Sequence, residues 1–416
     1  PQEFTFARGS NLSATRIDKA GLIVKGRENV LLQSNGFYTT WTTSNASLTS
    51  GQSGYDGTND AFILTKNNAN GRVNQNIASS GVQTFSTYVK ANESQWAVLF
   101  STSPNSGKFF NLSNGTIGGN LLAAPLDATI ESVGNDWYRI SITISATINQ
   151  VRIYAADGDG DTSGTSGSIY IQDAQLEQGL AASPYIETTT TSAQAGVLEN
   201  TPRLNYTTGV ANPYLLLEPS RTNQMRYSEY QSGGGFNLGA NITWNGFVES
   251  PEGVNNASRF TSSTPSASFI QASNIVIPSG DFTYSMWVRG ISGSFISRPL
   301  YIPSSTIGGV YMNEAPVAGE DWKLVYGTGN NSGSAVTRQI TLPFYDQPAG
   351  AVWEMYGFQL EAGSYPTSYI PTYSVSATRA QDVCNKTNAS GEINSTEGVL
   401  YAEVAALDNP TAQEIA

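Results

Sequence analysis

The most regular spacing of carboxylates lies at residues 157–161, where Asp157, Asp159 and Asp161 alternate with two glycines. Alternating carboxylates of this kind are typical of calcium-binding loops, in which several oxygens surround the ion. The glutamate that closes such a loop at its twelfth position is absent, because Ser168 stands there. Glycine and aspartate also suit a tight turn between two strands. The pattern therefore predicts either a hairpin turn or a structural calcium site.

Two glutamates in matching contexts raise the question of glycoside hydrolysis. Glu177 and Glu361 each follow a Gln-Leu pair that begins at Gln175 and Gln359. A glycosidase needs two carboxyl groups about 5 to 9 Å apart in one site. Because these glutamates occupy corresponding positions of an internal repeat, they fall in separate modules. We therefore expect structural roles for both and no enzymatic activity.

Aromatic side chains outside the repeat are the candidates for carbohydrate binding. An exposed ring near polar groups stacks on the C–H surface of a sugar, while amides and hydroxyls bond to its hydroxyl groups. A single aromatic residue is equally explained by core packing, whereas two or more on one exposed face indicate a site. The candidates are Trp41, Tyr55, Trp96, Phe109, Phe110, Asn111 and Asn114 in the first half of the chain and Trp244, Tyr301 and Tyr345 in the second half.

One candidate set lies in an insertion at residues 103–126, which only the first copy of the repeat contains. This segment is rich in glycine and asparagine and predicts an extra hairpin or a long loop. It carries Phe109, Phe110, Asn111 and Asn114. Inserted loops on a retained framework commonly carry function, so we expect a glycan site here. The alternatives are that the phenylalanines fold inward as a lid or that the insertion packs on a neighbouring subunit.

Composition excludes several classes of chemistry. The 416 residues include no histidine and a single cysteine, Cys384. The absence of histidine excludes Ser-His-Asp and Cys-His catalysis and HExxH zinc sites, and one cysteine cannot close a disulfide within the chain. With 21 Lys+Arg, 33 Asp+Glu and a net charge of −12, no basic face for nucleic acid is expected. Since no apolar run approaches the length of a membrane span, we expect no membrane insertion.

Strand patterns dominate the chain, and no segment shows a useful helical period. At residues 138–144, for example, three isoleucines alternate with Arg139, Ser141 and Thr143. Half-buried antiparallel strands need a second layer over their apolar face. The sequence therefore predicts an all-β protein built from β-sandwiches.

An internal duplication organises these strands. Its matches occur in the same order at offsets of about 184 to 199 residues, which is unlikely by chance. Trp137 matches Trp322, and Tyr88 matches Trp287, so we expect these repeated aromatic residues to pack in the fold. The matching segments are 84–90 with 283–289, 134–137 with 319–322, 168–177 with 352–361, and 183–186 with 367–370.

Domain boundaries follow from the duplication. Because residues 397–404 alternate like a strand and the chain starts at Pro1 rather than methionine, we expect a piece of a longer polypeptide. The predicted parts are an N-terminal lead-in segment (1–27), a first module (28–190), a linker (191–212), a second module (213–382), and a linker with the first strand of a truncated third domain (383–416).

Short motifs at the module boundaries occur in a fixed order. They lie at residues 4–8, 14–16, 21–32, 215–223, 366–371 and 377–379, beside the paired Gln-Leu-Glu strands. Together they resemble motifs of bacteriophage fibre and appendage proteins. In that family they delimit carbohydrate-binding-module-like jelly-roll domains, often followed by a concanavalin-like lectin domain, whose first strand residues 398–403 resemble. The resemblance implies tandem jelly-roll β-sandwich modules joined by short linkers. The first module departs from the pattern, because residues 183–187 lack the second proline and the Thr-Arg pair.

The function implied is a non-enzymatic structural component of a phage virion appendage, a tail or head fibre, that attaches to host-surface glycans. The implied partners are two further copies in a homotrimer, other virion proteins through the N-terminal region, and a host cell-surface glycan. The implied location is the surface of the virion. Two alternatives stay open: a purely architectural spacer without a ligand, and accessory glycan-binding modules of a glycan-degrading enzyme. Apart from the calcium considered above, no cofactor is expected.

Overall fold

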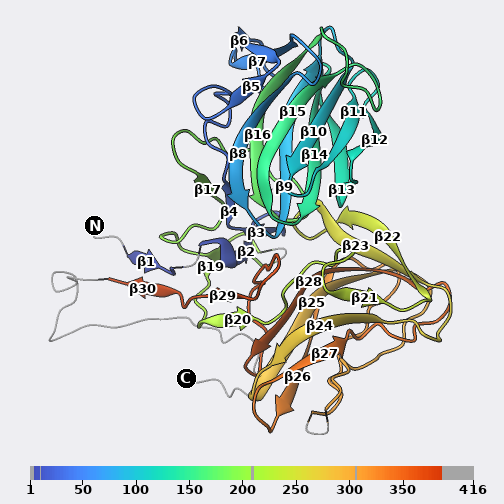
Figure 1. Cartoon of the computed structure of the whole chain (residues 1–416). Coiled ribbons are helices and arrows are strands. Elements are labelled where there is room, and N and C mark those ends of the chain that lie inside the picture. Colours follow the sequence, from blue (N-terminus) through green and yellow to red (C-terminus); the bar gives the residue numbers. More distant parts are fainter. Residues whose placement is uncertain (1–3, 10, 208–209, 305–306, 387–416) are drawn as a thin grey trace, which may run out of the picture. The chain divides into compact units, whose positions relative to one another are not determined.

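The computed structural model describes residues 4–9, 11–207, 210–304 and 307–386, which form β-strands, turns and connecting segments (Figure 1). Within these ranges the one helical element is a single turn, η1 (Asn11–Ser13). The all-β fold predicted from the alternating sequence is confirmed. No helix in the described part of the chain is long and apolar enough to cross a membrane. The strand expected at residues 397–404 lies outside the described residues.

The chain divides into two compact units, each with its own hydrophobic core. The first unit comprises residues 27–196 together with 254–256. The second comprises the described residues of 1–26, 197–253 and 257–416. The lead-in segment thus belongs with the second unit up to Gly26, and the segment expected as a linker divides between the units after Gly196.

The first unit is a sandwich of two antiparallel six-stranded sheets, with strand orders β12-β11-β10-β15-β8-β5 and β13-β14-β9-β16-β7-β6. From β7 to β10, successive strands alternate between the two sheets, and β14, β15 and β16 do so again, which gives the strand order of a jelly roll. The strands are β5 (Thr42–Ser44), β6 (Ala46–Gln52), β7 (Ala61–Lys66), β8 (Arg72–Ser79), β9 (Val82–Ala91), β10 (Trp96–Thr102), β11 (Ser106–Asn111), β12 (Thr116–Leu122), β13 (Asp127–Gly134), β14 (Trp137–Ser145), β15 (Ile148–Ala156) and β16 (Ser168–Gln178).

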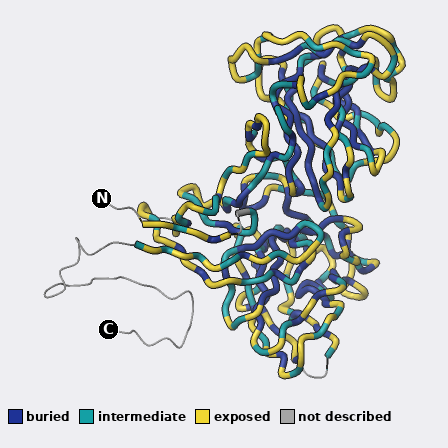
Figure 2. The backbone as a smooth tube through the Cα atoms, turned by 60° about the vertical axis from the view of Figure 1, so that its left-hand side comes forward, coloured by how far each residue is buried: buried dark blue, intermediate teal, exposed yellow. Residues whose placement is uncertain are grey.

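Alternation along these strands builds the core of the first sandwich. Ile140 and Ile142 on β14 and Ile169 and Ile171 on β16 are fully buried in one cluster with residues of the opposite sheet. Figure 2 shows the buried backbone as dark blue runs along the strands. The insertion at residues 103–126 forms the hairpin of β11 and β12, the first of the two expected forms, and this hairpin extends one sheet.

The second unit is a sandwich of a five-stranded sheet, β22-β23-β28-β25-β26, and a three-stranded sheet, β21-β24-β27. Trp353 is fully buried at its centre, with ring centroids 5.4 Å from Phe344 and 5.9 Å from Phe260. The strands are β21 (Phe236–Leu238), β22 (Ile242–Glu249), β23 (Asn255–Ser262), β24 (Ile270–Ile277), β25 (Gly280–Ser292), β26 (Lys323–Asn331), β27 (Val336–Thr341) and β28 (Val352–Ala362).

Short strand pairs tie the connecting segments together. In the first unit β4 (Arg27–Asn29) pairs with β17 (Ala193–Ala195). The pairs in the second unit are β1 (Thr5–Ala7) with β30 (Val383–Asn385), β2 (Thr15–Ile17) with β3 (Ile23–Lys25), β18 (Leu204–Asn205) with β19 (Tyr214–Leu215), and β20 (Arg221–Asn223) with β29 (Ala377–Arg379).

Buried charges fasten the lead-in segment within the second unit. Arg8 lies 3.1 Å from Asp382, which also pairs with Arg203. Arg203 and Arg379 both pair with Glu218, at 2.8 and 3.1 Å, and all five side chains are at most 7% exposed. Burial raises the pKa of Glu218, but the positive charges of Arg379 and Arg203 together lower it by more. The pKa of Glu218 therefore lies below its usual range. The network joins segments from both ends of the described chain.

The hydrogen-bond pattern of the two sandwiches repeats the sequence duplication. In the first, Thr84 and Thr143 lie opposite each other on β9 and β14, and their hydroxyl oxygens are 2.9 Å apart. In the second, Thr283 and Thr328 lie opposite each other on β25 and β26, 3.1 Å apart. These positions differ by 199 and 185 residues, the offsets of the matching segments. The duplication therefore fixes which residues of the two sandwiches correspond.

Candidate functional site

The repeated Gln-Leu-Glu motif of the first sandwich holds a loop in place. Gln175 donates from Nε2 to Glu177 at 2.6 Å and accepts from the amide of Ile186 at 2.7 Å. Glu177 accepts from the amide of Ser183 at 2.7 Å and from its hydroxyl at 2.5 Å. Gln175 and Glu177 are both buried, so the carboxylate of Glu177 stabilises the conformation of the loop and does not face a substrate.

The second sandwich repeats this arrangement. Gln359 donates to Glu361 at 2.7 Å and accepts from the amide of Ile370 at 2.7 Å, and Glu361 accepts from the amide of Thr367 at 2.8 Å. Burial raises the pKa of Glu361, although hydrogen bonds from Thr367 and Gln359 oppose the rise. Each glutamate belongs to its own unit and has the same structural partners.

The three aspartates of residues 157–161 hydrogen-bond to different protein groups. Asp157 pairs with the buried Lys66, Asp159 accepts from the amide of Gly119 at 2.6 Å, and Asp161 accepts from an amide two residues further along the chain at 2.8 Å. No group of three potential acidic, cysteine or histidine metal ligands occurs among the described residues. The segment has the hydrogen bonding of a turn, the first of the two predicted readings.

The structure buries the phenylalanines of the inserted hairpin, so the stacking set expected there is not presented to solvent. Phe109 and Phe110 are both 0% exposed because adjacent residues of β11 face opposite sides of the sheet and both sides are covered. Phe110 packs in the main core and Phe109 in a smaller cluster. Asn111 and Asn114 accept hydrogen bonds from amides of their own turn. Both rings therefore fold inward, as in the alternative that places the phenylalanines of the insertion inside the sandwich.

The other aromatic candidates of the first unit also pack internally. Trp41 is 6% exposed and its indole N–H donates to the carbonyl of Leu32 at 3.1 Å. Trp96 is half-buried against the smaller cluster of Phe109. Tyr55 stacks on Tyr88, with ring centroids 3.7 Å apart and ring planes 5° from parallel. None of these three residues joins another in an exposed aromatic patch.

The second unit presents an aromatic patch. Tyr301 and Tyr311 are 51% and 60% exposed, and Tyr345 is half-buried. The guanidinium carbon of Arg298 lies 5.4 Å from the centroid of the Tyr345 ring, and Arg298 also reaches Asp346 at 3.7 Å. We call these five residues the tyrosine patch. Trp244, the remaining candidate, is half-buried instead and donates to the hydroxyl of Ser258 at 3.1 Å.

Long-range pairing assembles the tyrosine patch. Tyr301 forms an antiparallel bridge with Thr341 of β27, while its neighbour Leu300 bridges to Val310, the residue before Tyr311. Burial raises the pKa of Tyr345, the positive charge of Arg298 opposes the rise, and Tyr311 and Tyr301 add to it. Two of the three tyrosines are sequence candidates. Tyr311 is not, although its place between buried Val310 and Met312 signals an outward-facing side chain.

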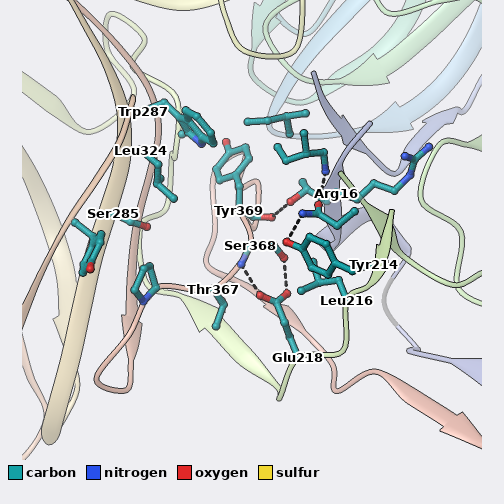
Figure 3. A pocket seen from close by; sticks show the side chains of 17 residues that line it. Arg16, Tyr214, Leu216, Glu218, Ser285, Trp287, Leu324, Thr367, Ser368 and Tyr369 are labelled. Carbon is teal, nitrogen blue, oxygen red and sulfur yellow. Dashed lines mark hydrogen bonds between the residues drawn. The ribbon is translucent and has the colours of Figure 1, made fainter. Parts of the chain in front are cut away.

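A separate pocket of about 310 Å³ lies in the second unit against the five-stranded sheet. Figure 3 shows Trp287 and Leu324 on one side, Tyr214 and Leu216 on the other, and Tyr369 between them. Trp287 faces away from the sandwich core because its neighbours on β25, Met286 and Val288, belong to that core and adjacent residues of a strand face opposite sides. Sequence reasoning assigned Trp287 to packing alone and missed the pocket, which forms where β2, β3, β18 and β19 approach the sheet.

Polar groups around this pocket are bonded to each other. Ser368 donates from its amide to Glu218 at 2.8 Å and from its hydroxyl at 2.6 Å. Asn205 accepts from the amide of Ile17 at 2.6 Å and donates to the hydroxyl of Tyr214 at 2.5 Å. The remaining lining is mainly aliphatic and aromatic. The pocket therefore offers a ligand apolar contact more than hydrogen bonds.

Comparisons with known proteins identify no family for the chain. No family model matches it, and no curated protein does. Among solved structures it is aligned with variants of oxalate decarboxylase from Bacillus subtilis. Two of these have 8% and 7% sequence identity and TM-scores of 0.11 and 0.10, and each alignment covers 82% of this chain and 79% of the other. Likeness at this level carries no argument about fold or activity.

Proposed function

We propose that this chain is a non-enzymatic structural component of a bacteriophage virion appendage that binds host-surface glycans through the tyrosine patch. The proposal rests on exposed Tyr301 and Tyr311, whose segments are joined by the Leu300–Val310 bridge, and on Tyr345 beside the Arg298–Asp346 ion pair. Two or more aromatic residues on one exposed face satisfy the criterion that distinguishes a binding surface from ordinary packing.

The chemistry of the tyrosine patch suits a sugar. Tyrosine rings offer flat apolar faces to the C–H groups of a pyranose, and their hydroxyls remain available at the edge. Arg298 supplies hydrogen-bond donors and Asp346 supplies acceptors beside the rings, and both side chains are partly exposed. Donors and acceptors placed around an apolar surface are the combination by which binding sites orient polar ligands.

The position of the acidic residues supports a binding role over a catalytic one. Glu177 and Glu361 lie in different units, and each is occupied by backbone and side-chain donors of its own loop. Asp346, the carboxylate of the tyrosine patch, is paired with Arg298. Glycoside hydrolysis requires a pair of opposed carboxyl groups, whereas the five residues of the tyrosine patch include one carboxylate, Asp346.

The virion setting rests on the resemblance of the boundary motifs to those of phage fibres. The motif residues Arg8, Glu218 and Arg379 belong to the buried charge network that fastens the second unit. A single patch of three rings binds a sugar weakly, and many copies on one particle raise the effective affinity through local concentration. A multicopy appendage therefore suits a module of this kind.

A glycan array probed with the intact chain tests the proposal. We expect binding to a restricted set of bacterial surface glycans, and loss of that binding in the Tyr301→Ala, Tyr311→Ala double variant with an unchanged melting temperature. The matched control is Tyr38→Ala, which removes a ring of similar exposure, 59%, from the first unit. Absence of binding to every bacterial surface glycan would favour the architectural spacer. Binding unaffected by the double substitution would remove the tyrosine patch as the site.

A further inference from the structure

We propose that the pocket at Trp287 is a docking site for an aromatic side chain of a partner protein, specifically a tyrosine that stacks on the indole ring. The first sandwich fills the corresponding position with a tyrosine of its own, and the second leaves that position open. The duplication thus supplies an internal template for the ligand. This inference concerns a surface separate from the tyrosine patch and does not depend on glycan binding.

The correspondence of the two positions follows from strand register. Tyr88 lies four residues beyond Thr84 on β9, and Trp287 lies four residues beyond Thr283 on β25. On the neighbouring strand Tyr88 lies opposite Arg139, and Trp287 lies opposite Leu324. Across the other neighbour, both strands meet β16 and β28 next to a register shift.

In the first sandwich, the ring of Tyr88 is covered. Tyr55 stacks on it face to face at 3.7 Å, and the guanidinium carbon of Arg139 lies 5.3 Å from its centroid. The Tyr55 hydroxyl donates to Asp173 at 3.0 Å, which holds the stacked ring in place. As a result Tyr88 is only 8% exposed.

In the second sandwich, smaller or apolar residues stand at these positions. Leu324 replaces the arginine and is 41% exposed at the wall of the pocket. Gly357 replaces Asp173 at the register shift, and both residues have positive φ angles, of 66° and 54°. Trp287 is half-buried and lines the pocket together with Leu324 and Gly357. The indole packs against the buried cluster of Ile23, Tyr356 and Tyr369, but no ring among the described residues stacks on it as Tyr55 stacks on Tyr88.

Size and polarity favour an aromatic ring over a sugar as the occupant. A pocket of about 310 Å³ is at the small end for ligand sites, which favours a small group such as one side chain over an extended molecule. A monosaccharide needs hydrogen-bond partners on several sides, but Ser368, Glu218 and Asn205 are bonded to protein groups. A phenol ring needs mainly apolar contact and one partner for its hydroxyl.

Titration of the intact chain with N-acetyltyrosinamide, followed by isothermal calorimetry, tests the proposal. We expect one weak site per chain. Leu324→Arg, which places a guanidinium where Arg139 lies over the Tyr88 ring beside the stacked Tyr55 in the first sandwich, should leave binding in place. Trp287→Ala should abolish it. Because Leu324 is 41% exposed, the arginine variant should fold, and an unchanged melting temperature verifies this.

The duplication supplies a gain-of-function counterpart. Tyr55→Ala uncovers Tyr88 in the first sandwich and should raise the stoichiometry of N-acetyltyrosinamide from one to two sites per chain. Methyl hexosides, used as the competing probe, should not bind at the pocket or displace the tyrosine derivative. Failure of the wild-type chain to bind, binding unchanged by Trp287→Ala, or preferential binding of a methyl hexoside would each overturn the proposal.

Discussion

Replacement of Asn223 tests how the repeated polar residues hold each sandwich. Asn223 is fully buried and makes four hydrogen bonds. Its amide donates to the carbonyls of Phe358 and Ile370 at 3.3 and 2.9 Å, and its carbonyl accepts from the amides of Met225 and Leu360, both at 3.1 Å. One side chain thus joins three segments of the second unit.

The expected magnitude follows from these four contacts. Asn223→Ala leaves four buried backbone groups without their partner, and each such group costs roughly 1 to 3 kcal/mol. We expect a loss of at least about 4 kcal/mol in the free energy of unfolding. For a sandwich of this size, that loss lowers the melting temperature by roughly 10 °C.

Differential scanning calorimetry of the intact chain is the assay, because each sandwich has its own core and is expected to melt on its own. Asn223→Ala should lower the transition of the second unit alone. Asn29, which makes the corresponding four hydrogen bonds in the first unit, supplies the reciprocal variant and should lower the other transition. Asn237→Ala, at an exposed position, is the control for loss of an amide. A shift below about 2 °C for Asn223→Ala would refute the reasoning.

Three further predictions concern the core, the pH dependence and the assembly. Trp353→Ala, at the fully buried centre of the second sandwich, should cost about 3 to 5 kcal/mol by chemical denaturation, and a loss under about 1 kcal/mol would contradict its place in the core. Burial raises the pKa of Asp173 to about 7, above its unfolded value, so the folded state favours the protonated form and the first unit should lose stability as pH rises through about 7. Asp173→Asn should flatten that dependence in melting curves from pH 4 to pH 9, whereas a wild-type curve that is already flat would contradict the assignment. The protein should be a homotrimer by mass photometry, because oligomerisation covers open sheet edges, and a stable monomer at micromolar concentration would exclude this.

Sequence patterns predicted the sandwiches because strand alternation and the repeated motifs can both be recognised in short stretches of the sequence. The three isoleucines of β14 share one buried face as their spacing requires, whereas the Gln-Leu-Glu strands are buried on both faces. The same patterns did not predict which aromatic rings are exposed. Phe109 and Phe110 lie on a strand whose two faces are both covered, so alternation carries no information there about exposure.

Long-range contacts explain the remaining differences. The Arg8–Asp382 ion pair, which fastens the lead-in segment, joins residues 374 positions apart. The tyrosine patch needs the bridge of Tyr301 to Thr341 and that of Leu300 to Val310, and neither has a local signal. At the pocket of Trp287, Leu324 stands where the first sandwich has Arg139. This correspondence can be recognised only when the strand register of the two sandwiches is known.

Isothermal titration of the intact chain with the glycan that binds most strongly on the array tests the central claim most directly, because it measures whether the tyrosine patch is where a sugar binds. Each stacked ring contributes about 0.5 to 1.5 kcal/mol, so loss of two rings should raise the Kd by a factor of roughly 5 to 150. We predict that change for the Tyr301→Ala, Tyr311→Ala variant, with the Kd of Tyr38→Ala equal to that of the wild type. An equal Kd for the double variant and the wild type would contradict the account.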